Sequence, residues 1–237
     1  KMVLQDKLNA LLEKYQINKD VQISSDNKII IDGKEIPLLP WRHERRFIEL
    51  KNMVRDGTLA DISTIKACRI DKKNVDLNHV IYRELDLCQW FTGSEVVEIM
   101  AFKNSRTANI IAKLENGVIC TVEAAVTLCE EAVPIDKHEI ISKRGIACDR
   151  VVDTQIPQQS VYVYENHKHP TTYTDVDFEL FGLNAEDVAF IRQAIEVAKN
   201  DSLTAELIES ANKLNQLIVL TDLSAEKVCN MKVGRKE

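Results

Sequence analysis

The chain has 237 residues, 45% of them hydrophobic, which is enough to fill the core of one large domain or two small ones. Its 37 acidic and 31 basic side chains give a formal net charge of −6 and are scattered along the sequence, which argues against a nucleic-acid partner. The N-terminal residues lack the continuous apolar stretch of a signal peptide or membrane span, so we expect a cytoplasmic protein with no membrane contact.

The first part of the chain predicts a small helix followed by a β-hairpin. Residues 3–15 alternate charge and leucine at helical spacing. Two β-rich runs then flank Asp32 and Gly33, a favoured pair for a two-residue hairpin turn. We place the domain boundary near Trp41, with an N-terminal extension over 1–40 and the main domain over 41–237.

The main domain begins with a helix, a strand and a second helix. Phe47, Leu50 and Val54 share one face of the first helix, and a glycine ends it. Residues 59–70 are rich in isoleucine, threonine and alanine and predict a strand. Residues 77–91 carry apolar side chains at a helical period, with Glu84 as the exception.

A long run of strands follows, and two helices close the chain. The segments 95–102, 107–114 and 117–126 are β-type runs separated by short polar turns, which predicts an antiparallel meander. Further runs at 137–142, 146–152 and 161–164 extend the predicted sheet to six strands or more. Asn184 begins the first closing helix in a pattern like a capping box.

This order of elements predicts an α+β fold with a large, mostly antiparallel open sheet and helices on one face. In the run 117–126, both alternating sets of side chains are partly apolar, as in a sheet that is buried on two sides. A bare second face would expose an apolar patch, and a second copy of the chain is an economical cover. We therefore expect a homodimer through the sheet face.

Four segments of the chain together carry a resemblance to a known family. They are RHERRFIELKNMVRDGTLADI at 42–62, YRELDLCQWFTG at 82–93, LENGVICTVEAAV at 114–126 and EDVAFIRQAI at 186–195. In this order they resemble the glucose-fructose oxidoreductase and inositol dehydrogenase family, whose catalytic helix has the consensus HxxDLxxWLxG. The resemblance implies that family's C-terminal domain, an α/β domain that contacts the substrate and makes the dimer interface.

The other half of that family is a Rossmann-type nucleotide-binding domain, so the resemblance implies NAD or NADP as cofactor of a complete enzyme. Such a domain needs a glycine-rich turn that leads into a helix N-terminus. The seven glycines here are isolated from one another, and the 40 residues before the match are too few for that domain. We expect this chain alone to bind no cofactor and to need a fused or separate nucleotide-binding partner.

The resemblance also implies site residues, with one departure from the family pattern. The family's catalytic histidine stands three residues before an aspartate, and here Arg83 stands three residues before Asp86. His79 lies one helical turn earlier, on the same face by spacing. Because histidine passes protons near neutral pH and arginine does not, His79 is the candidate catalytic residue. Arg83 and Asp86 are candidate contacts to a sugar-like ligand. The alternative for His79 is a surface histidine at a helix start.

Three further residues are candidate substrate contacts. Arg42 and Arg45 belong to a basic cluster that suits a phosphate or carboxylate, although such clusters are usually the polar face of a helix start. His138 lies in a predicted strand and faces either a pocket or water. His167 and His169 predict a solvated turn, and the six cysteines lack the compact spacing of a zinc site, so we expect no metal.

Two functions stay open from the sequence. In the first, the chain is the substrate-binding and dimer-forming portion of an NAD(P)-dependent, sugar-type oxidoreductase. In the second, it is a stand-alone, non-catalytic ligand-binding or assembly module descended from that family. The missing glycine turn and the arginine at position 83 favour the second.

Overall fold

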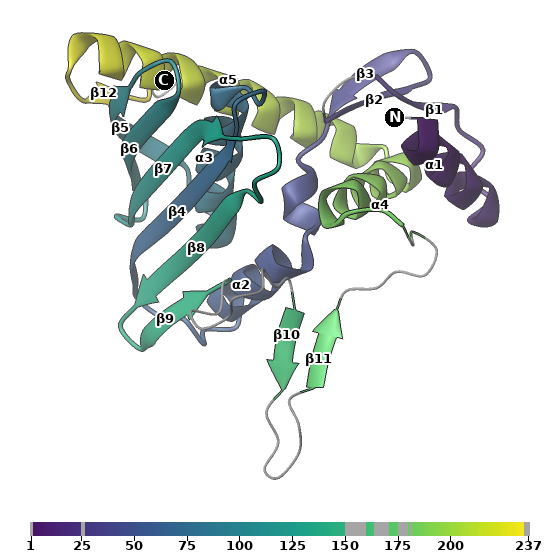
Figure 1. Ribbon diagram of the computed structural model, residues 1–237, viewed down its shortest axis with the longest axis horizontal. Coiled ribbons are helices and arrows are strands. Elements are labelled where there is room, and N and C mark those ends of the chain that lie inside the picture. Colours follow the sequence, from purple (N-terminus) through teal and green to yellow (C-terminus); the bar gives the residue numbers. More distant parts are fainter. Residues whose placement is uncertain are drawn as a thin grey trace. The chain divides into compact units, whose positions relative to one another are not determined.

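A computed structural model of the chain describes residues 2–24, 27–149, 160–163, 171–174, 180 and 182–234. The chain forms two compact units, Lys1–Ile48 with Arg150–Ser210, and Glu49–Asp149 with Ala211–Glu237. Figure 1 labels the elements of both. The two units are defined by contacts within the chain and do not test where a domain begins. The domain boundary near residue 41 therefore stays a prediction. None of the helices in the described ranges is both long and apolar enough to cross a membrane.

The first unit contains the predicted helix and hairpin. Helix α1 (Met2–Lys14) precedes β1 (Val21–Ile23), β2 (Lys28–Ile31) and β3 (Lys34–Pro37), which pair as an antiparallel sheet in that order. Asp32 and Gly33 have φ angles of 51° and 79°, as the two central residues of such a turn require. The prediction is confirmed, and β1 adds a strand that its three residues were too few to reveal.

Helix α4 (Ala185–Lys199) contacts two other helices of the first unit. The short helix η1 (Pro40–His43) and α1 both contact it. Asn184 caps α4 as predicted, because its side chain accepts a hydrogen bond from the backbone N–H of Asp187 at 2.8 Å. Strands β10 (Ser160–Val163) and β11 (Thr171–Thr174) pair in a two-stranded sheet of their own. The expectation that the run beginning at 161 extends the large sheet is therefore wrong, since the next strand along the chain is its partner.

The second unit is built on a seven-stranded sheet in the order β12-β5-β6-β7-β4-β8-β9. Its strands are β4 (Ile62–Lys72), β5 (Val96–Lys103), β6 (Thr107–Leu114), β7 (Ile119–Leu128), β8 (Ile135–Ser142), β9 (Gly145–Cys148) and β12 (Met231–Lys232). The predicted meander is confirmed in β5, β6 and β7. Strand β4 lies between β7 and β8, parallel to the first and antiparallel to the second, so the sheet is mixed but mostly antiparallel.

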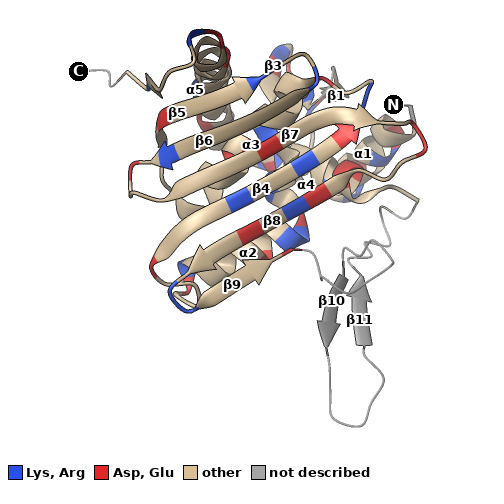
Figure 2. Cartoon of the chain, turned by 60° about the vertical axis from the view of Figure 1, so that its left-hand side comes forward, with Lys and Arg blue, Asp and Glu red and all other residues tan. Residues whose placement is uncertain are grey.

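Helices lie on one face of this sheet, which confirms the predicted α+β fold. Helix α2 (Arg45–Arg55) leads into the unit, and α3 (Leu77–Thr92) packs on β4, β6 and β7. Helix α5 (Ser202–Lys227) joins β5 through Ser224, whose hydroxyl accepts a hydrogen bond from the backbone N–H of Ala101 at 2.9 Å. Figure 2 looks onto the opposite face, where Thr121 and Glu123 are exposed while their neighbour Val122 is buried under the helices.

Candidate functional site

Helix α3 carries the residues that the sequence singled out, and its two ends are well defined. The Asp76 carboxylate caps its first turn by accepting a hydrogen bond from the backbone N–H of Asn78 at 3.1 Å. Gly93 ends the helix with a φ of 65°, a left-handed conformation that glycine adopts readily. Between these two ends, charged side chains of the helix point toward the sheet. Arg83 is 4% exposed and Glu84 is fully buried.

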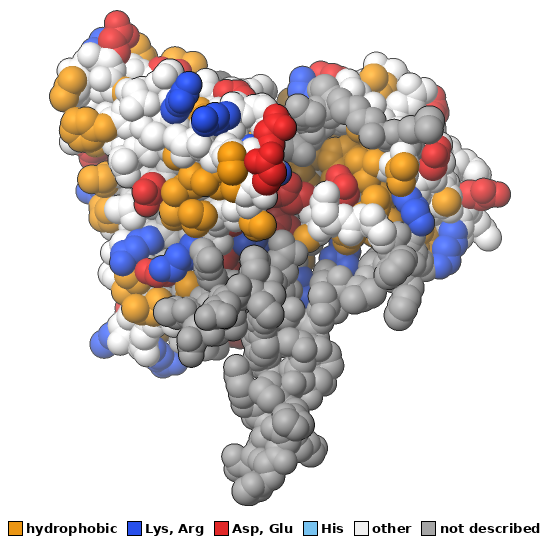
Figure 3. All heavy atoms as spheres, viewed as in Figure 1, with side chains coloured by type: hydrophobic (Ala, Val, Ile, Leu, Met, Phe, Trp, Pro, Cys, Tyr) orange, Lys and Arg blue, Asp and Glu red, His pale blue; other side chains and the backbone are white. Residues whose placement is uncertain are grey.

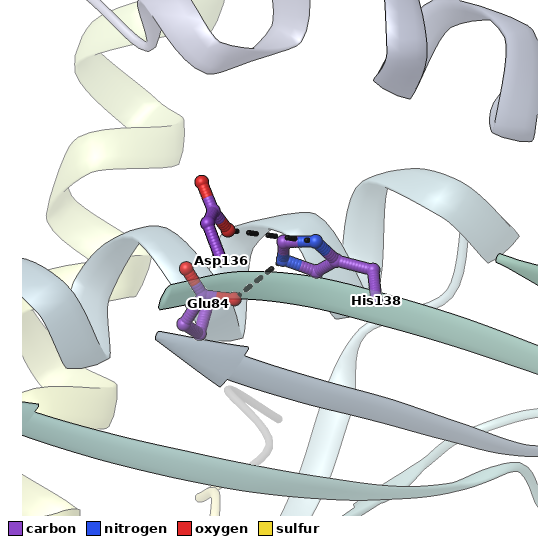
Figure 4. A group of neighbouring side chains, drawn as sticks. All are labelled: Glu84, Asp136 and His138. Atoms are coloured by element: carbon purple, nitrogen blue, oxygen red, sulfur yellow. Dashed lines mark hydrogen bonds and ion pairs between the residues drawn. The ribbon is translucent and has the colours of Figure 1, made fainter. Parts of the chain in front are cut away.

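His138 lies at the centre of a buried charge cluster between α3 and the sheet (Figure 4). Its side chain has no exposed area. Its Nε2 atom lies 2.7 Å from Oε2 of Glu84, and its Nδ1 atom lies 2.7 Å from Oδ2 of Asp149. The second carboxylate oxygen of Asp149 accepts the backbone N–H of His138, also at 2.7 Å. This one imidazole therefore joins α3, strand β8 and the residue that follows β9.

Two arginines complete the cluster. Arg83 is ion-paired with its neighbour Glu84, and its Nη2 atom lies 2.9 Å from Oδ2 of Asp136. Arg69 of β4 places Nη1 2.9 Å from the same Asp136 oxygen and donates from Nε to Asp71 at 2.9 Å. Buried charges are costly unless they are paired and hydrogen-bonded, and these contacts supply the pairing.

The cluster fixes the protonation of its two central groups. Burial disfavours the charged form of His138, but Glu84 and Asp149 together outweigh it and raise the pKa of the imidazole to about 9. Burial likewise opposes ionisation of Glu84, but Arg83 and His138 outweigh it and hold the pKa of that carboxyl below its usual value. Both shifts favour the charged forms of the two groups.

The same side chains have the spacing of metal ligands. Glu84, Asp136 and His138 each offer one atom, and these atoms lie within 4.8 Å of one another. Both ring nitrogens of His138 already contact carboxylates, and Asp136 already holds two guanidinium groups. A metal ion would have to displace the histidine proton and separate Asp136 from the arginines. We therefore interpret the group as an ion-pair network.

The structure brings together only part of the predicted site. Arg83 and His138 lie in the cluster, joined through Glu84 and Asp136. Asp86 is on the same helix with no exposed area, and His79 is half-buried near the start of that helix. The substrate and proton-transfer roles suggested for these residues stay predictions.

Arg42 and Arg45 belong to the other compact unit, in η1 and at the start of α2. Between them stands His43, whose Nε2 atom lies 3.2 Å from the Glu196 carboxylate. Burial first, and then the charges of Arg192 and Arg42, lower the pKa of His43 to about 4. At neutral pH the imidazole is therefore uncharged, and this contact is not an ion pair. The predicted turn with His167 and His169 lies outside the described residues.

Sequence reasoning missed most of the charged partners, although one signal was present. Glu84 interrupts an apolar helical stripe, and an acid at such a position needs a buried cation. The arginine and aspartate of β4 are two residues apart, as are Asp136 and His138 of β8, so each pair points to one face of its strand. The sequence does not show which face of the sheet each pair occupies. Both pairs face α3 because β4 pairs with β8 in the sheet.

The opposite face of the sheet carries a shallow hollow of about 560 Å³, lined in part by Lys66, Cys68, Glu123 and Lys137. Burial and the nearby Glu123 carboxylate raise the pKa of Cys68 to about 11, so it is a thiol at neutral pH. Phe102, also in the lining, is 63% exposed. Figure 3, in the view of Figure 1, shows patches of hydrophobic side chains with charged side chains among them on the surface of this unit.

Comparison with solved structures finds the same fold in inositol dehydrogenases. The scyllo-inositol dehydrogenase from Lactobacillus casei with bound NAD(H) and scyllo-inositol matches with a TM-score of 0.59 and 18% identity, over 82% of this chain and 63% of the other. Myo-inositol 2-dehydrogenase from Lactobacillus plantarum gives 0.61 and 14%, over 83% and 64%. The myo-inositol dehydrogenase from Corynebacterium glutamicum gives 0.61 and 12%, over 84% and 64%.

These matches confirm the fold that the sequence resemblance implies. The chain spans less than two thirds of the length of each of these dehydrogenases. No protein-family profile matches the sequence, and no curated protein matches it either.

Proposed function

We propose that this chain is the substrate-binding and dimer-forming portion of an NAD(P)-dependent oxidoreductase that acts on a sugar or polyol. The observation that carries the proposal is the fold, which it shares over 82% of its length with an inositol dehydrogenase that binds NAD(H) and scyllo-inositol. The nicotinamide cofactor would be held by a nucleotide-binding domain outside the matched part. The chain itself would contribute ligand contacts and a sheet face for a second copy.

The proposed ligand site is the N-terminal part of α3. His79 is the residue there that is not fully buried and that exchanges protons near neutral pH, so it is the proposed acid-base group. Arg83 and Asp86 would contribute from the next turns of the same helix. A ligand that reaches Arg83 would have to replace Asp136, which holds its guanidinium at 2.9 Å.

Titration of the chain with myo-inositol and scyllo-inositol tests this site. We expect amide chemical-shift changes that concentrate on the first two turns of α3 and that are lost in His79→Ala. The exposed residue Arg106, in the turn after β5, provides a control, and Arg106→Ala should bind as the parent chain does. Shift changes confined to other elements, or none at saturating polyol, would contradict the proposed site.

Nucleotide binding by the chain alone tests whether the cofactor site lies outside this chain. Because no glycine-rich turn offers its backbone to a pyrophosphate, we expect neither NAD nor NADP to bind the chain alone. Calorimetric titration measures this directly. A dissociation constant below about 100 μM, or roughly −5.5 kcal/mol, would show that the chain holds the cofactor itself.

A second candidate function is a non-catalytic ligand-binding or assembly module. The specific observation in its favour is Arg83, which stands where the family resemblance implies a catalytic histidine and is bound to two carboxylates. An arginine so placed anchors charge and cannot transfer a proton. Assay of the longest natural form of the protein with polyols and NAD separates the candidates, because only the first predicts nucleotide reduction.

A further inference from the structure

The ring of His138 has a carboxylate on each nitrogen, and both contacts are short. Oε2 of Glu84 lies 2.7 Å from Nε2, and Oδ2 of Asp149 lies 2.7 Å from Nδ1. A neutral imidazole has one N–H donor and one acceptor lone pair. In the neutral form one of these carboxylates would therefore face a lone pair at hydrogen-bond distance, with no proton between them.

We propose that His138 is protonated at neutral pH and that this buried imidazolium is the clamp that fastens the end of the β8–β9 hairpin to helix α3. The clamp has three attachments. His138 stands on β8, Glu84 on α3, and Asp149 directly after β9. Asp149 also accepts a hydrogen bond from the backbone N–H of His138 at 2.7 Å, so the ring and the backbone of His138 both bind this carboxylate.

Other groups of the cluster also lie around the ring. Asp136 places an oxygen 3.7 Å from Nδ1, and Phe91 of α3 meets the ring edge-on with centroids 6.3 Å apart. Arg83 binds Glu84 and Asp136, and Arg69 binds Asp136 and Asp71, so Glu84 and Asp136 also have guanidinium partners. The side chain of Asp149 has no exposed area, and its carboxylate lies 2.7 Å from Nδ1 of His138.

Loss of the proton would therefore leave two buried carboxylates beside a neutral ring. The pKa of His138 is raised from 6.5 to about 9, which agrees with the geometry. Because the folded pKa lies above the unfolded one, the stabilisation is complete below pH 6.5 and decreases as the pH rises to 9. Above pH 9 it is absent, and we expect the end of β9 to detach from α3.

Nitrogen-detected NMR of the imidazole rings tests the proposal on the native chain. At pH 7.5 we expect two protonated ring nitrogens in His138, with slow exchange of both protons. His43 is the internal control, since its pKa is lowered to about 4 and it must show the pattern of a neutral tautomer at the same pH. A neutral tautomer of His138 at pH 7.5 would overturn the proposal.

The pH dependence of stability gives a second readout. In the parent chain the folding equilibrium constant should decrease by up to about tenfold per pH unit between 6.5 and 9, and amide exchange in β9 should accelerate over the same range. His138→Gln should be less stable at pH 6.5 and lack this pH-dependent component. If the variant does not fold, the measurements on the parent chain decide alone. A flat profile in the parent chain contradicts the clamp.

The same cluster permits one competing occupant, a metal ion in place of the proton. Zinc titration of the chain at pH 7.5 distinguishes the two. We expect no stoichiometric binding and no change in melting temperature with a chelator. Tight binding of one ion, with loss of both ring N–H signals of His138, would show that the site holds metal and that the imidazolium assignment is wrong.

Discussion

At the scale of single residues, Arg83 sets the charge pairing on the face of α3 that packs against the sheet. Its guanidinium neutralises Glu84 beside it and reaches across to Asp136 of β8. A histidine at this position would have a shorter side chain and at most two ring N–H donors, against the five N–H donors of the guanidinium. The arginine therefore makes the helix face a fixed ionic contact, while leaving His79 as the half-buried titratable group of the same helix.

Truncation of Arg83 should be strongly destabilising. Arg83→Ala leaves Glu84 and Asp136 with less cationic compensation in a buried site, and removing one partner of a buried pair costs roughly 3–5 kcal/mol of unfolding free energy. Urea denaturation measures the loss. The matched control Arg106→Ala removes an exposed arginine and should change stability by less than about 0.5 kcal/mol. A loss below 1 kcal/mol for Arg83→Ala would show that the network is not energetically coupled.

At the scale of elements, local signals predicted most helices and strands correctly. The Asp32-Gly33 turn, the Asn184 cap and the Gly93 stop all depend on residues within a few positions of one another, so the sequence displays them directly. The insertion of β4 between β7 and β8 depends on contacts between residues 55 and 75 positions apart, as in the pairs Ile65 with Cys120 and Ile65 with Ile140. Local patterns carry no information about such a choice of partner.

The same difference explains the incomplete prediction of the charge cluster. Helical spacing relates His79, Arg83 and Asp86, but it does not show that Arg83 and Asp86 are buried while His79 is half-buried. His138 was recognised as a candidate, yet its partners Glu84 and Asp149 lie 54 and 11 positions away. Pairing of this kind appears only once α3 is packed against the sheet.

At the scale of the whole molecule, the sheet face opposite α3 exposes side chains from several strands. It combines exposed apolar side chains, such as Phe102 at 63% and Ile111 at 53%, with Lys66, Glu123 and other charged residues. An apolar patch with charges of both signs suits a second copy, because a two-fold axis can bring each lysine near a glutamate of the other copy. We therefore retain the proposed homodimer through this face.

Light scattering at micromolar concentration tests the dimer, and Phe102→Lys probes its location. A two-fold interface contains the substitution twice, so it removes two buried apolar groups and adds two like charges, and we expect dimerisation to weaken by at least about tenfold, or 1.4 kcal/mol. Val219→Lys is the matched control, since Val219 is 58% exposed on helix α5 and lies outside the sheet face. If the parent chain is a monodisperse monomer, the proposed dimer is wrong. Equal weakening by both variants would instead place the interface elsewhere on the molecule.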